Sequence, residues 1–219
     1  MIVSADDIAR GHVFVIAAPS GTGKTTLCRR ILEADSRLCL SVSHTTRPPR
    51  TGEEDGVDYH FVDSKRFHLL NSEGAFLEHA EYGGNAYGTS WQAIDEPLAT
   101  GRDVVLEIEV QGAAQVKDRR PTAILIFLLP PSLKILEQRL RGRQTDEESV
   151  IHRRLALADN ELAAAKIFDF AVVNDDLDQA VAEVLDVIEA VRTGREEAIA
   201  AQHGREKVLA EWEIAQETA

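Results

Sequence analysis

The chain has 219 residues, and its 24 lysines and arginines against 37 aspartates and glutamates give a net charge of −13. This balance argues against a general nucleic-acid binder, because contact with a polyanion needs a basic surface. A hydrophobic fraction of 44% and a charged fraction of 28% are typical of a globular protein with one core of ordinary size.

The chain opens on a short polar segment, followed by a predicted strand and a predicted helix. Residues 1–11 carry two aspartates and no apolar segment, so they do not resemble a secretory leader, and we expect a cytoplasmic protein. Residues 12–18 form an apolar run of strand length, and Lys24–Ala34 follow with a helical pattern. Cys28 and Cys39 are expected to stay reduced, since a single disulfide is unusual in such a chain.

A phosphate-binding loop is predicted between this strand and helix. Residues 18–25, APSGTGKT, match the pattern G-x-x-x-x-G-K-[ST], with Ala18 in place of the first glycine. The glycines let backbone N–H groups turn toward an anion at the helix N-terminus, Lys24 reaches the β- and γ-phosphates, and the Thr25 hydroxyl can bind Mg²⁺. The alternative is a plain glycine-rich turn. The predicted ATP-binding residues here are Ala18, Pro19, Ser20, Gly21, Thr22, Gly23, Lys24, Thr25 and Thr26.

Strands and helices alternate along the rest of the chain, with further buried strands predicted over residues 38–42, 103–110, 122–129 and 168–173. The apolar run at 123–131 is far shorter than the ~20 residues of a membrane helix, so no membrane partner is expected. Ser132 is placed to cap the next helix, another is expected from Asp176 to Gly194, and Pro97 should kink or shorten an earlier one. The alternation predicts an α/β fold with a largely parallel sheet flanked by helices.

Two polar segments interrupt the alternation. Residues 43–58 are rich in proline, glycine and charge, and residues 59–88 continue with short strands around a helix at Ser64–Ser72, so together they predict an inserted lobe. Residues 139–154 are charge-dense between two helical patterns, which favours a mobile helical lid. After Gly194 the chain is rich in alanine and glutamate, and an amphipathic terminal helix is expected.

The first polar segment carries Arg47 and Arg50 around two prolines, where two guanidinium groups on a stiff turn could clamp a phosphate monoester. Taken alone, the two arginines favour a solvated charged loop. Together with Glu78, the run GNAYGT at 84–89 and VNDD at 173–176, however, the segment resembles guanylate kinase, and bacterial members in particular. The resemblance extends from the phosphate loop to about Val191.

The resemblance implies a P-loop NTPase-like core at 1–42, 90–130 and 155–194, a GMP-binding lobe at 43–89, a lid region at 131–154 and a helical extension at 195–219. By position, the residues implied to hold the GMP phosphate are Ser43, Arg47, Arg50, Tyr59 and Tyr87. Glu78 and Thr89 match the residues that recognise the base. Without the resemblance, Glu78 would be an ordinary surface carboxylate and the two tyrosines would be half-buried aromatic residues.

The chemistry of guanine agrees with the implied base contacts. Guanine presents N1–H and N2–H donors side by side, which the Glu78 carboxylate can accept together, and the Thr89 hydroxyl can donate to O6 or N7. Adenine would leave the carboxylate badly matched, and an unmatched buried polar group makes discrimination large.

The residues implied to be catalytic are Lys24, Arg47, Arg139, Arg143 and Arg154. The last three match arginines that close over the transferring phosphoryl group in similar kinases, whereas Arg141 and Arg153 are interpreted as a solvated helix face. Asn174 matches a residue near the donor nucleotide, and Mg²⁺ is expected to arrive with ATP at Thr25.

One stretch departs from the family pattern. Residues 105–112 read VLEIEVQG, where the family more usually has aspartates at the positions of Glu107 and Glu109. Because residues i and i+2 of a strand share a face, both carboxylates are expected to point toward the site. Both are kept as GMP-site residues without fixed roles.

The sequence therefore predicts an ATP-dependent guanylate kinase, with ATP and GMP as its small-molecule partners. One alternative is a kinase of similar fold that acts on another small phosphorylated acceptor, such as a sugar phosphate. Another is a binding module, since guanylate-kinase-like domains of scaffold proteins bind phosphorylated peptides without catalysis; the almost complete phosphate loop argues against it. The sequence leaves the oligomeric state open and is compatible with a homo-oligomer.

Overall fold

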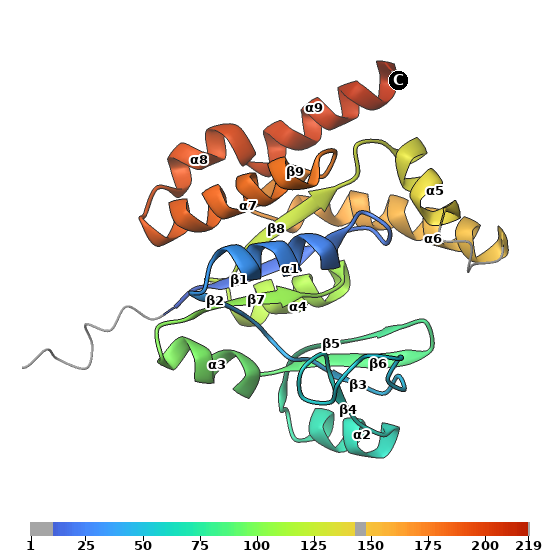
Figure 1. The fold of residues 1–219 in the computed structure, drawn as a ribbon, viewed down its shortest axis with the longest axis vertical. Helices are drawn as coiled ribbons and strands as arrows, with labels where there is room; N and C mark the ends of the chain where they lie inside the picture. The colour runs from blue at the N-terminus through green and yellow to red at the C-terminus, as the bar shows by residue number, and fades with distance from the viewer. Residues whose placement is uncertain (1–10, 143–147, 219) are drawn as a thin grey trace, which may run out of the picture. The chain divides into compact units, whose positions relative to one another are not determined.

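The computed structural model describes residues 11–142 and 148–218 and contains a five-stranded sheet (Figure 1). The strand order is β2-β7-β1-β8-β9, with β1 (Val13–Ala17), β2 (Leu38–Leu40), β7 (Asp103–Glu107), β8 (Ile124–Leu129) and β9 (Phe170–Val173). β1 runs parallel to β8, β8 to β9, and β2 to β7. The predicted parallel sheet with flanking helices is confirmed. Among the described residues, none of the helices is long and apolar enough to span a bilayer.

The chain divides into two compact units. The first comprises Met1–Val13, Ser36–Leu106 and Gln111–Ala123, and the second comprises Phe14–Asp35, Glu107–Val110 and Ile124–Ala219.

The second unit holds β1, β8 and β9 with α1 (Lys24–Ala34), α5 (Leu133–Arg141), α6 (Glu148–Ala163), the short helix η2 (Ala164–Ile167), α7 (Leu177–Arg192), α8 (Glu196–His203) and α9 (Arg205–Thr218). Its core is aromatic as well as aliphatic, since Phe127 and Phe168 are fully buried with ring centroids 4.9 Å apart. The predicted cap is confirmed at Ser132, whose hydroxyl accepts the Ile135 N–H at the start of α5. Gly194 follows α7 with a φ of 64°, as the predicted helix end requires.

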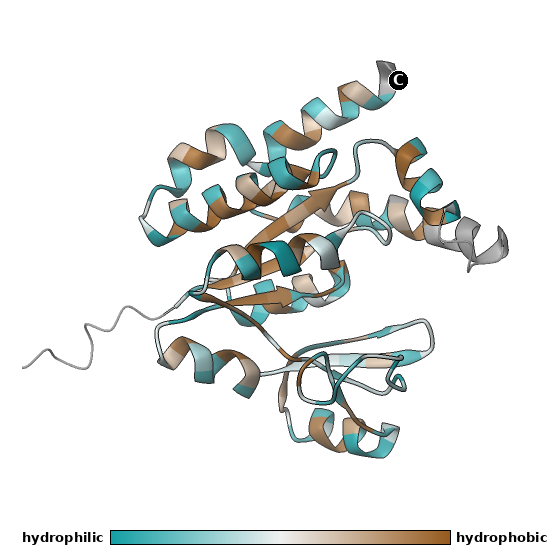
Figure 2. Cartoon of the chain, viewed as in Figure 1, coloured by the Kyte–Doolittle hydropathy of each residue, from teal (hydrophilic) through white to brown (hydrophobic). Residues whose placement is uncertain are grey.

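The first unit contains a second sheet with the strand order β4-β3-β6-β5. The strands are β3 (His44–Thr45), β4 (His60–Phe61), β5 (Phe76–Tyr82) and β6 (Asn85–Ser90), and the helices are α2 (Ser64–Ser72), α3 (Gln92–Ala99) and α4 (Val110–Arg119). β5 and β6 form an antiparallel pair that sets Glu78 opposite Thr89. Figure 2 shows β1 and β8 in uniform brown and the β5–β6 pair in paler, mixed colours. The residues of β1 are all buried, whereas β6 is only partly buried.

Two predicted strand ends need correction. The strand expected over 103–110 ends at Glu107, and α4 begins at Val110, so Glu109 lies in the link between them. β2 ends at Leu40, two residues earlier than expected. Pro97 lies inside α3, which ends two residues later at Ala99.

The single terminal helix expected after Gly194 is wrong as well, because the structure has two helices that meet at Gly204. A Cβ at position 204 would lie 2.4 Å from the Ala200 carbonyl oxygen, so only glycine fits this junction. α9 then packs in the second unit through Trp212, which is 8% exposed and donates its indole N–H to the Pro130 carbonyl oxygen at 2.6 Å.

Candidate active site

The phosphate-loop motif lies between the end of β1 at Ala17 and the start of α1 at Lys24, as its sequence context predicts. Gly21 and Gly23 have φ values of 96° and 102°, which residues with a side chain rarely adopt. A Cβ on Gly23 would also lie 2.7 Å from the Asn174 side-chain nitrogen. Glycine is therefore required at position 23 both by backbone conformation and by packing.

Asn174 holds this loop from the end of β9. Its side-chain N–H donates to the Thr22 carbonyl oxygen at 2.7 Å, and the residue is only 5% exposed. The Arg139 guanidinium on α5 contacts the same carbonyl. It donates to the Thr22 carbonyl oxygen at 3.3 Å and to the Asn174 carbonyl oxygen at 3.2 Å. Asn174 was predicted near ATP and Arg139 as an arginine that closes over the transferring phosphoryl group, and here both contact the backbone of the loop.

Lys24 and Thr25 lie beside two carboxylates, one at the end of β7 and one in the link between β7 and α4. The Lys24 ammonium, 13% exposed, donates to the Ile108 carbonyl at 2.7 Å and to Glu109 Oε1 at 3.2 Å. Burial alone would lower the pKa of Lys24, but attraction to Glu109 and Glu107 outweighs it, so the pKa is raised and the group stays charged. The Thr25 hydroxyl donates to Glu107 Oε1 at 2.5 Å.

Glu109 was expected to share a strand face with Glu107, and that reason is wrong because Glu109 lies beyond the strand. The end of β7 and the following link nevertheless bring both carboxylates to the N-terminus of α1, against Lys24 and Thr25. The described contacts of both carboxylates are therefore with phosphate-loop residues of the second unit.

A third carboxylate near this loop was missed in the sequence. Burial raises the pKa of Glu161 on α6 to about 7, and repulsion from Glu109 adds to the shift. Lys24 and the Ser20 backbone N–H oppose it by favouring the carboxylate. No motif marks Glu161, since its position near the loop depends on the packing of α6.

The first unit collects the residues predicted to hold a phosphate. The Arg47 guanidinium lies 5.4 Å from the ring centroid of Tyr59, and the rings of Tyr59 and Tyr87 are 6.0 Å apart. Arg47 donates to Glu53 Oε1 at 2.8 Å, and Glu53 Oε2 accepts the Arg50 backbone N–H at 2.7 Å. Glu53 was not predicted from the sequence, where its only signal is its position three residues after Arg50.

The residues predicted to recognise a base are buried and joined in a chain of hydrogen bonds. Glu78 is 3% exposed and Thr89 is fully buried. The Thr89 hydroxyl donates to Glu78 Oε1 at 2.5 Å, and 2.9 Å separate it from the Ser43 hydroxyl. Because a hydroxyl carries one hydrogen, Ser43 is the donor to Thr89 in this arrangement. The Thr89 hydrogen is thus committed to Glu78, and donation to guanine would require it to turn.

The described residues cover only part of the predicted lid. Arg143 lies outside the described residues, and the side chain of Arg154, in α6, is outside them too. Arg139 is described and contacts the phosphate loop. Arg141 pairs with Glu137 one turn earlier on α5 at 2.8 Å, with 41% of its side chain exposed.

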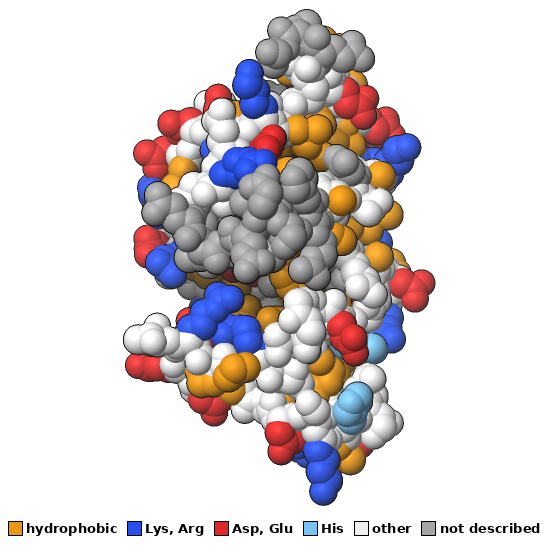
Figure 3. All heavy atoms as spheres, turned by 90° about the vertical axis from the view of Figure 1, so that its right-hand side faces the viewer, with side chains coloured by type: hydrophobic (Ala, Val, Ile, Leu, Met, Phe, Trp, Pro, Cys, Tyr) orange, Lys and Arg blue, Asp and Glu red, His pale blue; other side chains and the backbone are white. Residues whose placement is uncertain are grey.

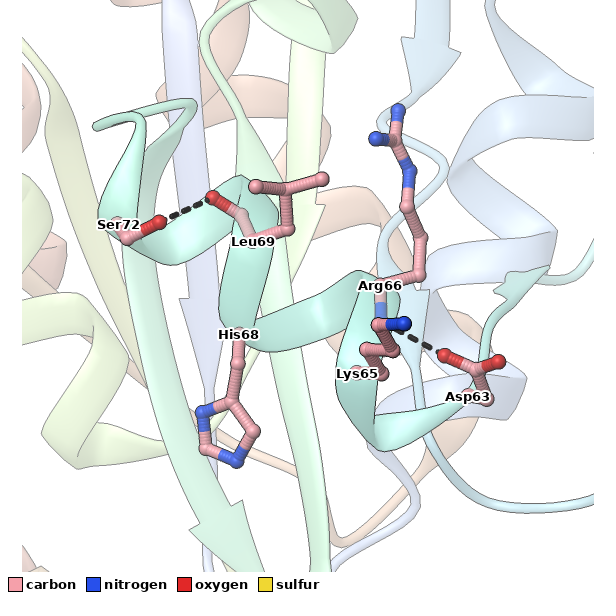
Figure 4. A pocket seen from close by; sticks show the side chains of 6 residues that line it. All are labelled: Asp63, Lys65, Arg66, His68, Leu69 and Ser72. Atoms are coloured by element: carbon pink, nitrogen blue, oxygen red, sulfur yellow. Dashed lines mark hydrogen bonds between the residues drawn. The ribbon is translucent and has the colours of Figure 1, made fainter.

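The surface shows two further features. On the face drawn in Figure 3, the acidic side chains are scattered rather than gathered into one patch. A hollow of about 560 Å³ lies beside α2 in the first unit and is lined by Asp63, Lys65, Arg66, His68, Leu69 and Ser72 (Figure 4). None of the residues predicted for ATP or GMP line this hollow.

Comparison with known proteins gives a consistent result. The family model of guanylate kinase matches residues 10–191. The guanylate kinase of Neisseria gonorrhoeae is 52% identical over 186 residues, which cover 85% of this chain and 91% of that protein. The guanylate kinase of Coxiella burnetii is 47% identical over 187 residues, with the same shares covered. The crystal structure of guanylate kinase from Anaplasma phagocytophilum superposes with a TM-score of 0.70 at 29% identity, over 89% of this chain and 96% of that one.

Proposed function

This chain belongs to the guanylate kinase family and transfers a phosphoryl group from ATP to GMP, and we propose that its second unit binds ATP while its first unit binds GMP. The observation that carries this division is the pair of anion-binding arrangements, one in each unit. The glycine loop with Lys24 suits a triphosphate, and the Arg47 cluster beside the buried Glu78 suits a nucleoside monophosphate. We also propose that the reaction takes place in the cytoplasm.

On the donor side, the loop supplies backbone N–H groups and the helix N-terminus of α1 to the ATP phosphates. Lys24 would leave the Glu109 carboxylate to contact the β- and γ-phosphates. Asn174 and Arg139 act on the Thr22 carbonyl, so their role is to keep the loop in shape. The predicted ATP site therefore combines groups that contact phosphate with groups that hold the loop.

The donor side also fits Mg²⁺. The Thr25 hydroxyl and the Glu107 carboxylate lie 2.5 Å apart, and both are hard oxygen ligands of the kind that Mg²⁺ prefers. Among the described residues no cluster of three or more His, Cys, Asp or Glu could hold a metal alone, which suits an ion that arrives with nucleotide oxygens. Bound there, Mg²⁺ would neutralise charge on the ATP phosphates.

On the acceptor side, Arg47, Arg50, Tyr59 and Tyr87 would hold the GMP phosphate, with Ser43 between this group and the base site. Glu78 would accept from guanine N1–H and N2–H. Because the acceptor phosphate is already ionised, transfer needs no strong general base. Catalysis consists of aligning the attacking oxygen and neutralising charge.

Water must be kept from the donor phosphates, since ATP would otherwise be hydrolysed. We propose that the lobe at 43–89 and the lid at 131–154 close on the core when both substrates bind, and that Arg143 and Arg154 then reach the transferring phosphoryl group. In this proposal, the rest of the chain consists of the core at 1–42, 90–130 and 155–194 and the helical extension at 195–219.

A coupled assay of ADP release tests the function directly. The purified chain is supplied with ATP and Mg²⁺ and with GMP, AMP, CMP, UMP or a sugar phosphate in turn. Rapid turnover with GMP alone is expected. Faster turnover with a sugar phosphate would favour the alternative kinase, and the absence of turnover with every acceptor would favour the binding module.

A further inference from the structure

We propose that Glu53 is a positioning residue for the acceptor phosphate: its carboxylate fixes the Arg47 guanidinium and the backbone at Arg50 so that both arginines meet the same phosphate. This proposal deepens the proposed function, since it rests on the assignment of Arg47 and Arg50 to the GMP phosphate. Glu53 itself is not expected to touch GMP.

Each oxygen of the Glu53 carboxylate has its own partner. Oε1 accepts from Arg47 Nη2 at 2.8 Å, and Oε2 accepts from the Arg50 backbone N–H at 2.7 Å. The side chains of Arg47 and Glu53 are only 12% and 19% exposed, so this ion pair is better shielded from water than a surface pair. The hydrogen bond from Arg47 lowers the pKa of Glu53, which keeps the carboxylate charged.

The Arg47 guanidinium is held from other sides as well. Its Nη1 donates to the Pro48 carbonyl at 2.8 Å, and the group lies over the rings of Tyr59 and Phe61 at 5.4 and 5.8 Å. A hydrogen bond with the Tyr87 side chain also raises the Arg47 pKa, after the larger effect of Glu53. Glu53 is therefore one of several contacts that hold the guanidinium close to both tyrosines.

Glu53 also closes the turn that carries Arg50. The Glu53 backbone N–H donates to the Arg50 carbonyl at 3.1 Å, while the Glu53 carboxylate accepts the Arg50 N–H. Gly52 supplies the positive φ of 90° inside this turn. The exposed Arg50 side chain thus starts from a backbone that is bonded in both directions, which limits where its guanidinium can reach.

Two roles of Glu53, repulsion of phosphate and positioning of the arginines, predict opposite effects on GMP binding when its charge is removed. As a charge, the carboxylate repels a phosphate dianion, so its removal should tighten GMP binding. As a positioning group it pre-organises two cations, so its removal should weaken GMP binding. The sign of the change in KM for GMP separates the two roles.

The test is the variant Glu53→Gln, which keeps the size of the side chain but offers one acceptor oxygen instead of two. We expect KM for GMP to rise about tenfold, the size typical of losing a group that orients a ligand contact, with KM for ATP unchanged. Glu54→Gln is the matched control, because it removes the same charge from an exposed neighbour. An unchanged or lower KM for GMP in Glu53→Gln would overturn the proposal.

Two further variants separate this proposal from the assignment on which it rests. Arg50→Ala removes a phosphate contact directly, so an unchanged KM for GMP in Arg50→Ala would reject the phosphate assignment itself. A raised KM in Arg50→Ala with no change in Glu53→Gln would reject only the positioning role. Glu53→Asp retains both oxygens on a shorter stem and should recover part of the loss, and thermal unfolding verifies that each variant is folded.

Discussion

The phosphate loop and the proposed GMP lobe would bind phosphate by different means. The loop uses backbone groups from one short run, in which Gly21 and Gly23 adopt positive φ and α1 begins directly afterwards. The lobe uses side chains from separate segments, with Arg47 and Glu53 in a connection and Glu78 opposite Thr89 on two strands. A binding site made of backbone groups can be formed by consecutive residues. A binding site made of side chains from distant segments forms only when those segments have paired.

Both regions hold a cation against a carboxylate, with opposite consequences. Lys24 contacts Glu109 at 3.2 Å, and this carboxylate lies where it would compete with a triphosphate. Arg47 contacts Glu53 at 2.8 Å, and this carboxylate also binds the backbone beside the clamp. In the loop, the contact of Lys24 with Glu109 would therefore be replaced by a contact with phosphate. In the lobe, the contact of Arg47 with Glu53 would remain when phosphate binds.

The largest effect is expected from Lys24→Ala, which removes the cation of the loop while leaving the lobe intact. The turnover number should fall by roughly a thousandfold, because a fixed positive charge no longer stabilises the transferring phosphoryl group. The same coupled assay measures it, and GMP binding by calorimetry should stay unchanged. Lys207→Ala, on an exposed face of α9 in the same unit, is the control. Turnover near the wild-type rate would reject the phosphate-loop assignment.

The next effect tests the lobe through Glu78→Gln. The amide keeps an oxygen for the Thr89 hydroxyl but can no longer accept two guanine N–H groups with a full charge. The preference for GMP over AMP in kcat/KM should fall by roughly 100-fold, since a charged, buried acceptor is lost. Glu81→Gln, on an exposed position of the same strand, should retain the preference. An unchanged preference in Glu78→Gln would remove this residue from base recognition.

The contrast between the two regions explains what the sequence could predict. The phosphate-loop motif is contiguous and lies between a strand and a helix, so residue spacing alone placed the loop, and Ser132 was recognisable as a cap from its neighbours. The residues of the lobe are separated by tens of positions, so their grouping came from the family resemblance. The spacing of Arg47 and Arg50 alone could not distinguish a clamp from a solvated loop.

What the sequence missed has a common physical cause. The apolar run VLEIEV suggested a strand through Val110, but the chain leaves the sheet after Glu107, and Ile108 instead offers its carbonyl oxygen to Lys24. Glu53 looked like one acid among several in a charged loop. Glu161 reaches the phosphate loop only through the packing of α6. Each of these positions is decided by tertiary contacts, which periodicity does not report.

A smaller effect is expected from Asn174→Ala, which tests whether the backbone site depends on a side-chain brace. Of the two described side chains that donate to the Thr22 carbonyl, the variant leaves Arg139, whose bond is longer at 3.3 Å. KM for ATP should rise about tenfold, and the free energy of unfolding should fall by about 1–3 kcal/mol because a buried carbonyl loses the shorter of its two side-chain hydrogen bonds. Asn160→Ala, on an exposed position of α6, is the control. An unchanged KM for ATP would mean that the loop keeps its shape without the brace.

The smallest effect is expected from Glu161→Gln, which should change thermal stability in a pH-dependent way. Glu161 is one of the carboxylates near Lys24. The pKa of Glu161 is raised to about 7 by burial and by Glu109, so ionisation opposes folding. Because the folded pKa lies above the ordinary value of 4.5, the wild-type protein loses stability from this group as the pH rises from about 4.5 to about 7.

Glutamine cannot ionise, so Glu161→Gln should unfold a few degrees above the wild type at pH 8, about 2–4 °C, with a smaller difference at pH 5. Thermal unfolding at the two pH values measures this, with Glu213→Gln on exposed α9 as the control. A variant less stable than the wild type at pH 8 would mean that Lys24 and the Ser20 N–H fully compensate the carboxylate. The carboxylates near Lys24 would then stabilise the loop, as Glu53 is proposed to stabilise the lobe. The two regions would then not differ in the role of their carboxylates.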